Sequence, residues 1–469
     1  MTDAPEITPA PGRPRLLLGS YALAEVGYTA REFFVSGTAT SYAPTAPLGP
    51  DGRWSVSPLG TADYTTRVVV LTPTDPARFN GTALVEWLNV SGGIDAPAVW
   101  MMGHREIVRA GYAYLAVSAQ KVGVDGGASL LGVDMSLKSQ DPARYAPLHH
   151  PGDAFAYDIF SQAGGLVQTA WDTGVLGELR AQRVIALGES QSAMFLTTYV
   201  NAVDPLAQTY DGFFVHSRFG PAAPLDGASI FDDAGAPQAV AFRPDLRVPL
   251  LTIITETDLF GGAREGYYYA RQPDNPWLRV WEIPGAAHAD NYTIQVAPID
   301  SGSAPLADLV AAYAPTNTLM GQQLSHHINF APQHHYVVQA ALAALNTWVR
   351  GGPPAPGAAP MQVRDAYGPQ PVPDANGLAQ GGVRTPWVDV PVARTSGRGG
   401  DEGVMAALFG SGELFDVDTL RLLYPRGVAE YLERFTAALD ASIRSGFILA
   451  ADRAEILELA AAAYPGDRP

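Results

Sequence analysis

The chain has 469 residues, of which 47% are hydrophobic and 16% are charged, so it can form a large core and overall disorder is not expected. Its formal net charge of −17 argues against a nucleic-acid partner and against an anionic membrane surface. The absence of cysteine excludes disulfides, thiolate metal sites and a cysteine nucleophile.

The beginning of the sequence shows no targeting pattern. The stretch MTDAPEITPAPGRPRLLLG lacks a basic start followed by an apolar run, so we expect no signal peptide. No window of about 18 apolar residues occurs, so we expect no transmembrane helix. We therefore expect a cytoplasmic protein without a membrane partner.

The first part of the chain predicts strands alternating with helices. Residues 1–15 are interpreted as a polar, proline-rich lead-in. Runs of β-branched, aromatic and apolar residues bounded by Gly or Pro predict strands, and helical periodicity between start and stop signals predicts helices. The strands are expected at 31–42, 64–73, 81–90 and 112–120, and the helices at 98–111 and 153–171.

The middle of the chain continues the alternation. Strands are predicted at 183–189, 211–217, 248–258 and 278–288, with helices after residue 190 and at 336–350. Short apolar strands that alternate with helices are typical of a mostly parallel, doubly wound sheet that is buried on both faces. The predicted fold class is therefore α/β.

The remaining residues predict an extension to this domain. Residues 351–360 (GGPPAPGAAP) are interpreted as a linker, and helices are expected at 428–446 and 452–464. Tyr431, Phe435, Leu439 and Ile443 form an apolar stripe at helical spacing, which favours packing against the α/β domain. We divide the chain into an α/β domain, 16–350, and a helical C-terminal extension with its linker, 351–469. Segments at about 219–246 and 292–334 are long and irregular, and are expected to cover the site.

The stretch ALGESQSA, residues 186–193, predicts a nucleophile on a tight turn between a strand and a helix. Such a turn needs a positive φ at the serine and small residues two positions before and after it, and Gly188 and Ser192 meet that need. The alternative is an ordinary serine at a helix start. The position of Ser190 at a strand-to-helix switch favours the nucleophile.

A serine nucleophile needs a base and a carboxylate that orients the base. His288, in the small-residue turn IPGAAHAD just past a strand, is the predicted base. The stretch IITETD places Glu256 and Asp258 near the end of the preceding strand. Asp258 is the preferred acid because the loop beyond the strand can bend toward the imidazole, and Glu256 is the alternative.

Two backbone groups are predicted to stabilise an oxyanion. The first is the N–H of Gln191, at the start of the helix after the serine. The second is expected from the loop LNVSGG (88–93), where Val90 or Ser91 can donate. A plain strand-to-helix turn is the alternative interpretation of this loop.

The sequence gives no pattern for a cofactor. His149-His150, His326-His327 and His334-His335 are adjacent pairs, and neighbouring side chains diverge in strands and helices, so such pairs rarely bind one metal ion. No H-E-x-x-H, G-x-G-x-x-G or P-loop lysine occurs. We predict neither a catalytic metal nor a nucleotide cofactor.

These motifs together resemble a known family. GESQS, TETD and GAAHAD are similar to the elbow, acid turn and histidine turn of the alpha/beta hydrolase superfamily. The elbow with EWLNVSGG, VSAQKVGV, ALAALNTWVRGG, GGVRTPWVDVP and the helical tail resembles a largely uncharacterised bacterial group of alpha/beta hydrolase domain proteins, from about residue 20 onward. One departure from the commonest superfamily pattern is Ser192 in place of the second elbow glycine.

The resemblance implies an α/β-hydrolase fold with cap insertions and a C-terminal extension, and it implies ester hydrolysis without naming a substrate. We expect a serine esterase with the triad Ser190, Asp258 and His288, acting on a small-molecule ester. Acyl transfer or lactone or amide cleavage by the same triad is an alternative within enzymes. A non-catalytic binding protein on the same fold is the alternative of another class. The sequence leaves open whether the chain forms a homo-oligomer.

Overall fold

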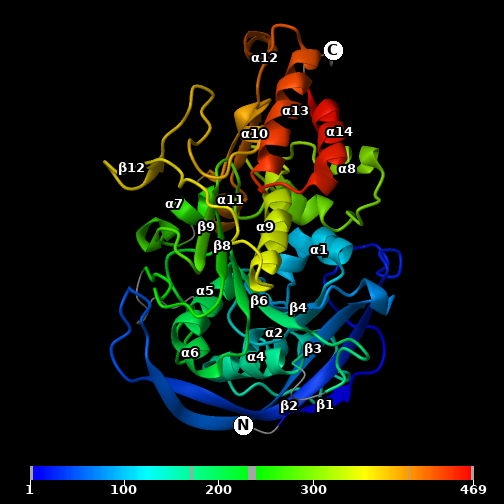
Figure 1. Cartoon of the computed structure of the whole chain (residues 1–469), viewed down its shortest axis with the longest axis vertical. Helices are drawn as coiled ribbons and strands as arrows, with labels where there is room; N and C mark the ends of the chain where they lie inside the picture. Colours follow the sequence, from blue (N-terminus) through cyan, green and yellow to red (C-terminus); the bar gives the residue numbers. More distant parts are fainter. Residues whose placement is uncertain (1–3, 169–172, 231–238, 263, 401, 466–469) are drawn as a thin grey trace.

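The computed structural model describes residues 4–168, 173–230, 239–262, 264–400 and 402–465. Its centre is a nine-stranded sheet with the strand order β1-β2-β3-β5-β4-β6-β7-β8-β9 (Figure 1). The strands of this sheet are β1 Glu6–Pro9, β2 Tyr28–Pro44, β3 Val56–Pro73, β4 Thr82–Trp87, β5 Ala113–Val117, β6 Arg183–Glu189, β7 Gly212–His216, β8 Leu250–Thr255 and β9 Leu278–Ile283.

The sheet is parallel from β5 to β9 and antiparallel at its other end. Strands β5, β4, β6, β7, β8 and β9 pair in parallel, whereas β1, β2, β3 and β5 pair antiparallel. The predicted α/β class with a mostly parallel sheet is confirmed. The lead-in was interpreted without a strand, but β1 pairs with β2, where Ile7 lies opposite Val35. Proline is tolerated in such an edge strand because one side of its backbone needs no partner.

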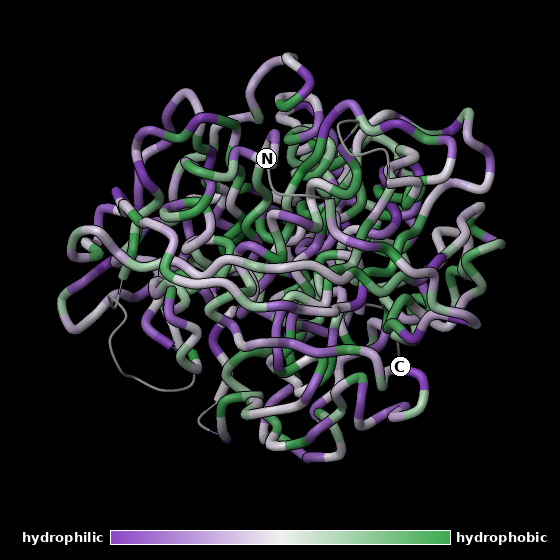
Figure 2. Tube along the Cα trace, turned by 90° about the horizontal axis from the view of Figure 1, so that it is seen from below, coloured by the Kyte–Doolittle hydropathy of each residue, from purple (hydrophilic) through white to green (hydrophobic). Residues whose placement is uncertain are grey.

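Two cores cover the two faces of the sheet, as expected for a doubly wound fold. Consecutive residues of β6 belong to different cores: Val184 and Ala186 pack with α4 and α5, and Ile185 and Leu187 pack with α1 and α9. Strand residues alternate between faces, so a continuous apolar run is what a sheet buried on both faces requires. Figure 2 shows the hydrophobic segments gathered in the interior.

The helices of the described residues include the predicted ones, with shifts at their ends. The predicted helix 153–171 is a 3₁₀ turn at Asp153–Phe155 followed by α4, and residues 169–171 lie outside the described part. The helices are α1 Ala98–Ala110, α2 Lys121–Asp125, α3 Leu137–Gln140, α4 Ala156–Gly165, α5 Gln191–Thr198, α6 Asp204–Ala207, α7 Glu256–Phe260, α8 Leu306–Ala312, α9 Gln333–Val349, α10 Pro386–Asp389, α11 Val404–Phe409, α12 Val417–Leu423, α13 Val428–Arg444 and α14 Arg453–Ala463.

The residues after α9 pack closely on the core beneath them. Tyr431, Phe435 and Leu439 of α13 are buried in the same core as α1 and α9. The segment 351–360 is not a free linker: the carbonyl of Ala355 accepts a hydrogen bond from Arg279 Nε, and that of Pro356 accepts one from Trp281 Nε1. These bonds hold the segment along β9. Short strand pairs lie outside the central sheet: β10 Thr318–Leu319, β11 Gln322–Gln323, β12 Val363–Arg364, β13 Gln370–Pro371, β14 Ala393–Ser396 and β15 Ser411–Leu414.

The two segments expected to be irregular differ from one another. The described residues of 219–246 carry neither helix nor strand, as predicted, and 231–238 lie outside the described part. The segment 292–334 is more ordered than predicted, because it contains α8 and the β10–β11 hairpin. Both segments meet α11 in one apolar cluster, formed by Phe219, Leu319, Leu324, Ile328, Ala406, Leu408 and Phe409.

Candidate active site

Ser190 lies at a strained turn between β6 and α5. Its φ is +56° and its ψ is −114°, a conformation that non-glycine residues rarely adopt. The turn leaves little room: a Cβ on Gly188 would lie 3.0 Å from the carbonyl oxygen of Ser192. The Ser192 hydroxyl donates to the carbonyl of Glu189 at 2.8 Å and accepts from the Glu189 N–H at 3.1 Å. Ser192, which stands in place of the second elbow glycine, therefore stabilises the turn through these two hydrogen bonds.

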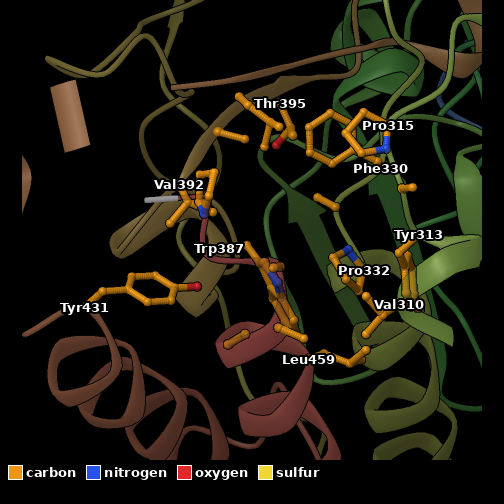
Figure 3. A pocket seen from close by; sticks show the side chains of 18 residues that line it. Val310, Tyr313, Pro315, Phe330, Pro332, Trp387, Val392, Thr395, Tyr431 and Leu459 are labelled. Carbon is orange, nitrogen blue, oxygen red and sulfur yellow. The ribbon is translucent and has the colours of Figure 1, made fainter. Parts of the chain in front are cut away.

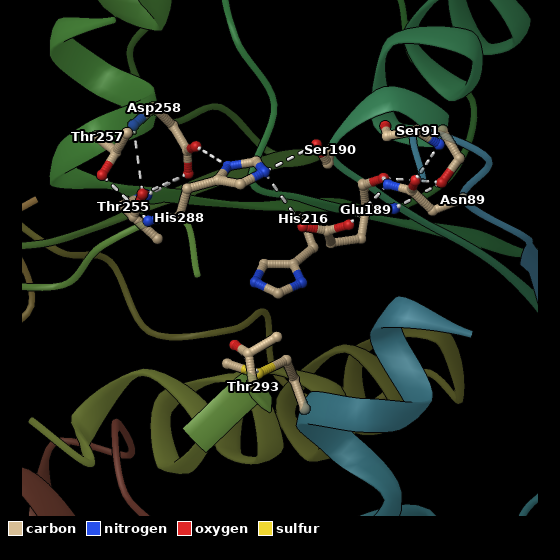
Figure 4. A network of polar contacts seen from close by, with 12 residues as sticks. Asn89, Ser91, Glu189, Ser190, His216, Thr255, Thr257, Asp258, His288 and Thr293 are labelled. Atoms are coloured by element: carbon tan, nitrogen blue, oxygen red, sulfur yellow. Dashed lines mark hydrogen bonds and ion pairs between the residues drawn. The ribbon is translucent and has the colours of Figure 1, made fainter. Parts of the chain in front are cut away.

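The three predicted triad residues meet in one hydrogen-bonded row, which Figure 4 shows at the carboxyl ends of the strands. The Ser190 Oγ lies 2.8 Å from His288 Nε2, and His288 Nδ1 lies 2.6 Å from Asp258 Oδ1. Asp258 is fully buried and His288 is 8% exposed. Because a carboxylate oxygen only accepts hydrogen bonds, the imidazole carries its proton on Nδ1 and presents Nε2 as the acceptor of the serine O–H.

The acid is held by a short helix rather than by the loop that was expected. Asp258 is the third residue of α7 and forms a capping box with Thr255. Its Oδ2 accepts from the backbone N–H of Thr255 at 2.8 Å and from the Thr255 hydroxyl at 2.7 Å, which leaves Oδ1 for the imidazole.

The alternative acid, Glu256, points elsewhere. Its Oε2 accepts from the N–H of Gly285 at 2.8 Å, and its Oε1 accepts from the Ser396 hydroxyl at 2.5 Å. The neighbouring Thr257 hydroxyl is bonded to the carbonyl of Gly397 and accepts from the N–H of His288 at 3.1 Å. Glu256 and Thr257 thus connect the acid turn and the histidine turn to the C-terminal extension.

The imidazole lies between two carboxylates. Burial disfavours its charged form, but the charge of Asp258, the hydrogen bond to it and the charge of Glu189 together raise the pKa of His288 above its usual value. Glu189 Oε1 lies 3.6 Å from His288 Nε2. Burial raises the pKa of Glu189 to about 7, although His288 and a hydrogen bond from Asn89 act in the other direction.

The predicted oxyanion donors lie beside the serine. The N–H of Gln191 belongs to the first turn of α5 and has no acceptor within its helix. The Val90 N–H donates to the side-chain Oε1 of Gln191 at 3.2 Å, and the Ser91 N–H donates to Asn89 Oδ1 at 2.8 Å. Both predicted loop donors therefore have acceptors within the chain.

The adjacent histidines have separate partners. His334 Nε2 lies 2.8 Å from His216 Nε2, whereas His335 Nε2 lies 2.9 Å from the Tyr313 hydroxyl oxygen. Burial lowers the pKa of His334 to about 4, so this histidine is neutral. Across the described residues, no three or more His, Asp or Glu side chains are arranged to hold a metal ion.

Sequence reasoning missed several residues around the triad. The Phe219 ring stacks on the His288 imidazole, with ring centroids 5.3 Å apart and 28° between the planes. The apolar cluster that contains Phe219 therefore covers one side of the base. Asn89, whose Nδ2 donates to the Glu189 carboxylate at 3.1 Å, was also missed. The letters of GESQS contain Glu189, but no local pattern indicates that it faces a histidine 99 positions later.

A separate apolar cavity of about 290 Å³ lies at the seam between the segment 292–334 and the C-terminal helices (Figure 3). Its lining includes Val310, Tyr313, Trp387, Tyr431 and Leu459. No triad residue lines it. The cavity is therefore a feature of the extension, distinct from the space around Ser190.

The elbow, the hydrogen-bonded row and the strand order define the protein as an α/β hydrolase. A model of the family described as alpha/beta hydrolase domain matches residues 3–458, and the chain belongs to this family. No curated protein matches the chain in sequence.

Solved structures resemble the chain at low identity and low TM-score. A putative dienelactone hydrolase from Klebsiella pneumoniae is 11% identical, with a TM-score of 0.32, covering 59% of this chain and 95% of its own. A cold-adapted esterase from an Arctic intertidal metagenomic library is 12% identical, with a TM-score of 0.32 and coverages of 55% and 86%. Acetyl xylan esterase 1 from Thermoanaerobacterium is 11% identical, with a TM-score of 0.30 and coverages of 61% and 83%. At these TM-scores, nothing about this chain follows from the likenesses.

Within the described ranges, no helix is both long enough and apolar enough to cross a bilayer.

Proposed function

We propose that the protein is a serine hydrolase that cleaves carboxylic esters through an acyl-enzyme. The observation that carries the proposal is the row Asp258–His288–Ser190, with contacts of 2.6 and 2.8 Å and the serine at positive φ. A half-buried hydroxyl on a strained turn, an acceptor nitrogen and a buried orienting carboxylate are the parts of an activated serine nucleophile.

In the proposed mechanism, His288 Nε2 takes the Ser190 proton as Oγ attacks the acyl carbon. Asp258 holds the Nδ1–H tautomer and stabilises the imidazolium. Collapse of the tetrahedral intermediate breaks the bond to the alcohol, whose oxygen receives the proton from Nε2. Water then attacks the acyl-enzyme by the same proton transfers, which releases the acid and restores Ser190.

The N–H groups of Gln191 and Val90 are proposed to stabilise the oxyanion. Since the Val90 N–H donates to the Gln191 side chain, the substrate oxygen must replace that carboxamide oxygen. Loss of a single 3.2 Å neutral hydrogen bond is a small cost beside the charge-assisted bond that replaces it.

The same residues are compatible with transfer of the acyl group to another alcohol, or with lactone or amide cleavage. A binding protein that retains the fold is the alternative of another class. Labelling by a fluorophosphonate probe separates this alternative from catalysis, because only an activated serine reacts quickly. A panel of short and bulky aryl esters, with and without an added alcohol, separates hydrolysis from transfer.

The decisive variant is Ser190→Ala, which removes only the hydroxyl. Turnover of the best ester is expected to fall about 10³-fold or more, with loss of probe labelling and an unchanged thermal unfolding temperature. Retained turnover, with the label on a different serine, would refute the proposal.

A further inference from the structure

Glu189 is a buried carboxylate in an energetically unfavourable position. It ends β6 directly before Ser190 and is 9% exposed. Within the described residues, its carboxylate receives one hydrogen bond, from Asn89 Nδ2. Burying a carboxylate with so few donors is unfavourable unless a positive charge compensates it.

Among the titratable groups that face Glu189 from neighbouring elements, one can supply such a positive charge. Asp258 on α7 and Glu86 on β4 are acidic, so neither can supply a positive charge. His216, opposite Glu189 in the register of β7, is neutral because burial and the neighbouring His334 lower its pKa. The remaining group is His288, which becomes a cation each time it takes a proton.

The geometry places this cation between two acceptors. Asp258 Oδ1 is 2.6 Å from Nδ1, and Glu189 Oε1 is 3.6 Å from Nε2, the nitrogen that also faces Ser190 Oγ. Figure 4 shows the ring between Asp258 and the Ser190–Glu189 pair, with Asn89 beside Glu189 on the side away from the ring. Glu189 therefore lies near the place where positive charge develops during serine attack.

We propose that Glu189 is a second carboxylate partner of the His288 imidazolium, acting from the serine side of the ring, and that it sets the pH at which the base becomes available. The inference rests on the proposed function of the triad. Glu189 favours the charged ring in the transition state, which speeds proton transfer. The same negative charge also favours the protonated ring before the reaction begins. His288 therefore loses its proton, and becomes able to act as a base, at a higher pH than it would beside Asp258 alone.

The bond between Glu189 and Asn89 suggests the alternative of a purely structural link between β6 and the loop after β4. The variant Glu189→Gln separates the two roles. The amide has nearly the same shape, and its oxygen can still accept from Asn89, so only the charge is lost. The pH profile of kcat/KM is the readout, because a structural role lowers the rate without moving the profile.

With Glu189→Gln, the alkaline plateau of kcat/KM is expected to fall about tenfold or more. The acid limb, which is the pH range where kcat/KM rises toward its plateau, is expected to move to lower pH by about half to one unit. The reason is that the imidazole loses a neighbouring negative charge. The ratio of variant to wild-type activity should therefore rise as the pH falls. Glu189→Asp keeps the charge on a shorter side chain and should move the limb less, which also supplies a test if the Gln variant does not fold.

Glu256→Gln is the matched control. Glu256 is also buried beside the acid turn, but it contacts Gly285 and Ser396 rather than the imidazole. Its loss should leave the acid limb at the wild-type pH. An unmoved limb in Glu189→Gln, or equal movement in the Gln and Asp variants, would overturn the inference. If Ser190 is still labelled and required in that case, the proposed function stands and only the role of Glu189 fails.

Discussion

Replacement of Asp258 by Asn gives the sharpest test of the triad, because the surroundings fix how the new amide must sit. Asp258 Oδ2 accepts from the backbone N–H of Thr255 at 2.8 Å, and a backbone N–H can only donate. The amide oxygen of Asn therefore stays with Thr255, and its NH₂ group faces His288 Nδ1.

An NH₂ group in that place donates to Nδ1 and forces the imidazole proton onto Nε2. The nitrogen 2.8 Å from the Ser190 hydroxyl is then a donor and cannot take the serine proton. Turnover is expected to fall by about 10³ to 10⁴-fold, equivalent to about 4 to 5.5 kcal/mol of activation free energy. The fold should persist, because the bonds to Thr255 are kept.

The assay is kcat/KM on an aryl ester for Asp258→Asn and Glu256→Gln, each checked for thermal unfolding. Glu256→Gln should cost less than about tenfold, since Glu256 only ties the acid turn to Gly285 and Ser396. An Asp258→Asn enzyme within tenfold of wild type, or a larger loss in Glu256→Gln, would refute the assignment of the acid.

Two further predictions concern the effects of pH and of metal chelation on activity. The base must be neutral to accept the serine proton, and the pKa of His288 is raised. Activity should therefore rise with pH, with a midpoint above the ordinary imidazole pKa of about 6.5, and then stay level into mild alkali. A midpoint well below pH 6 would contradict the presence of two carboxylates beside the imidazole. Prolonged EDTA should leave activity unchanged, because the mechanism requires no metal; loss on chelation with recovery on adding Zn²⁺ or Mn²⁺ would show that the reaction depends on one.

Local patterns in the sequence determined the elements and the chemical parts. Val184 to Leu187 form a buried run, Gly188 and Ser192 are small, and a helix follows Ser190. These features depend on neighbours within a few residues, where sterics and periodicity act. The order of serine, acid and histidine is likewise a property of the sequence, and it limited the candidate acid to Glu256 or Asp258.

The tertiary structure decided which of these parts meet. The choice of Asp258 follows from its capping box with Thr255, which turns the Asp258 carboxylate toward the imidazole. The Glu256 carboxylate instead accepts hydrogen bonds from Gly285 and Ser396. The approach of Glu189 to His288 depends on how the ends of β6 and β9 lie across the sheet. Distances of this kind are set by packing between segments about 100 residues apart, and side-chain spacing along the chain carries no information about them.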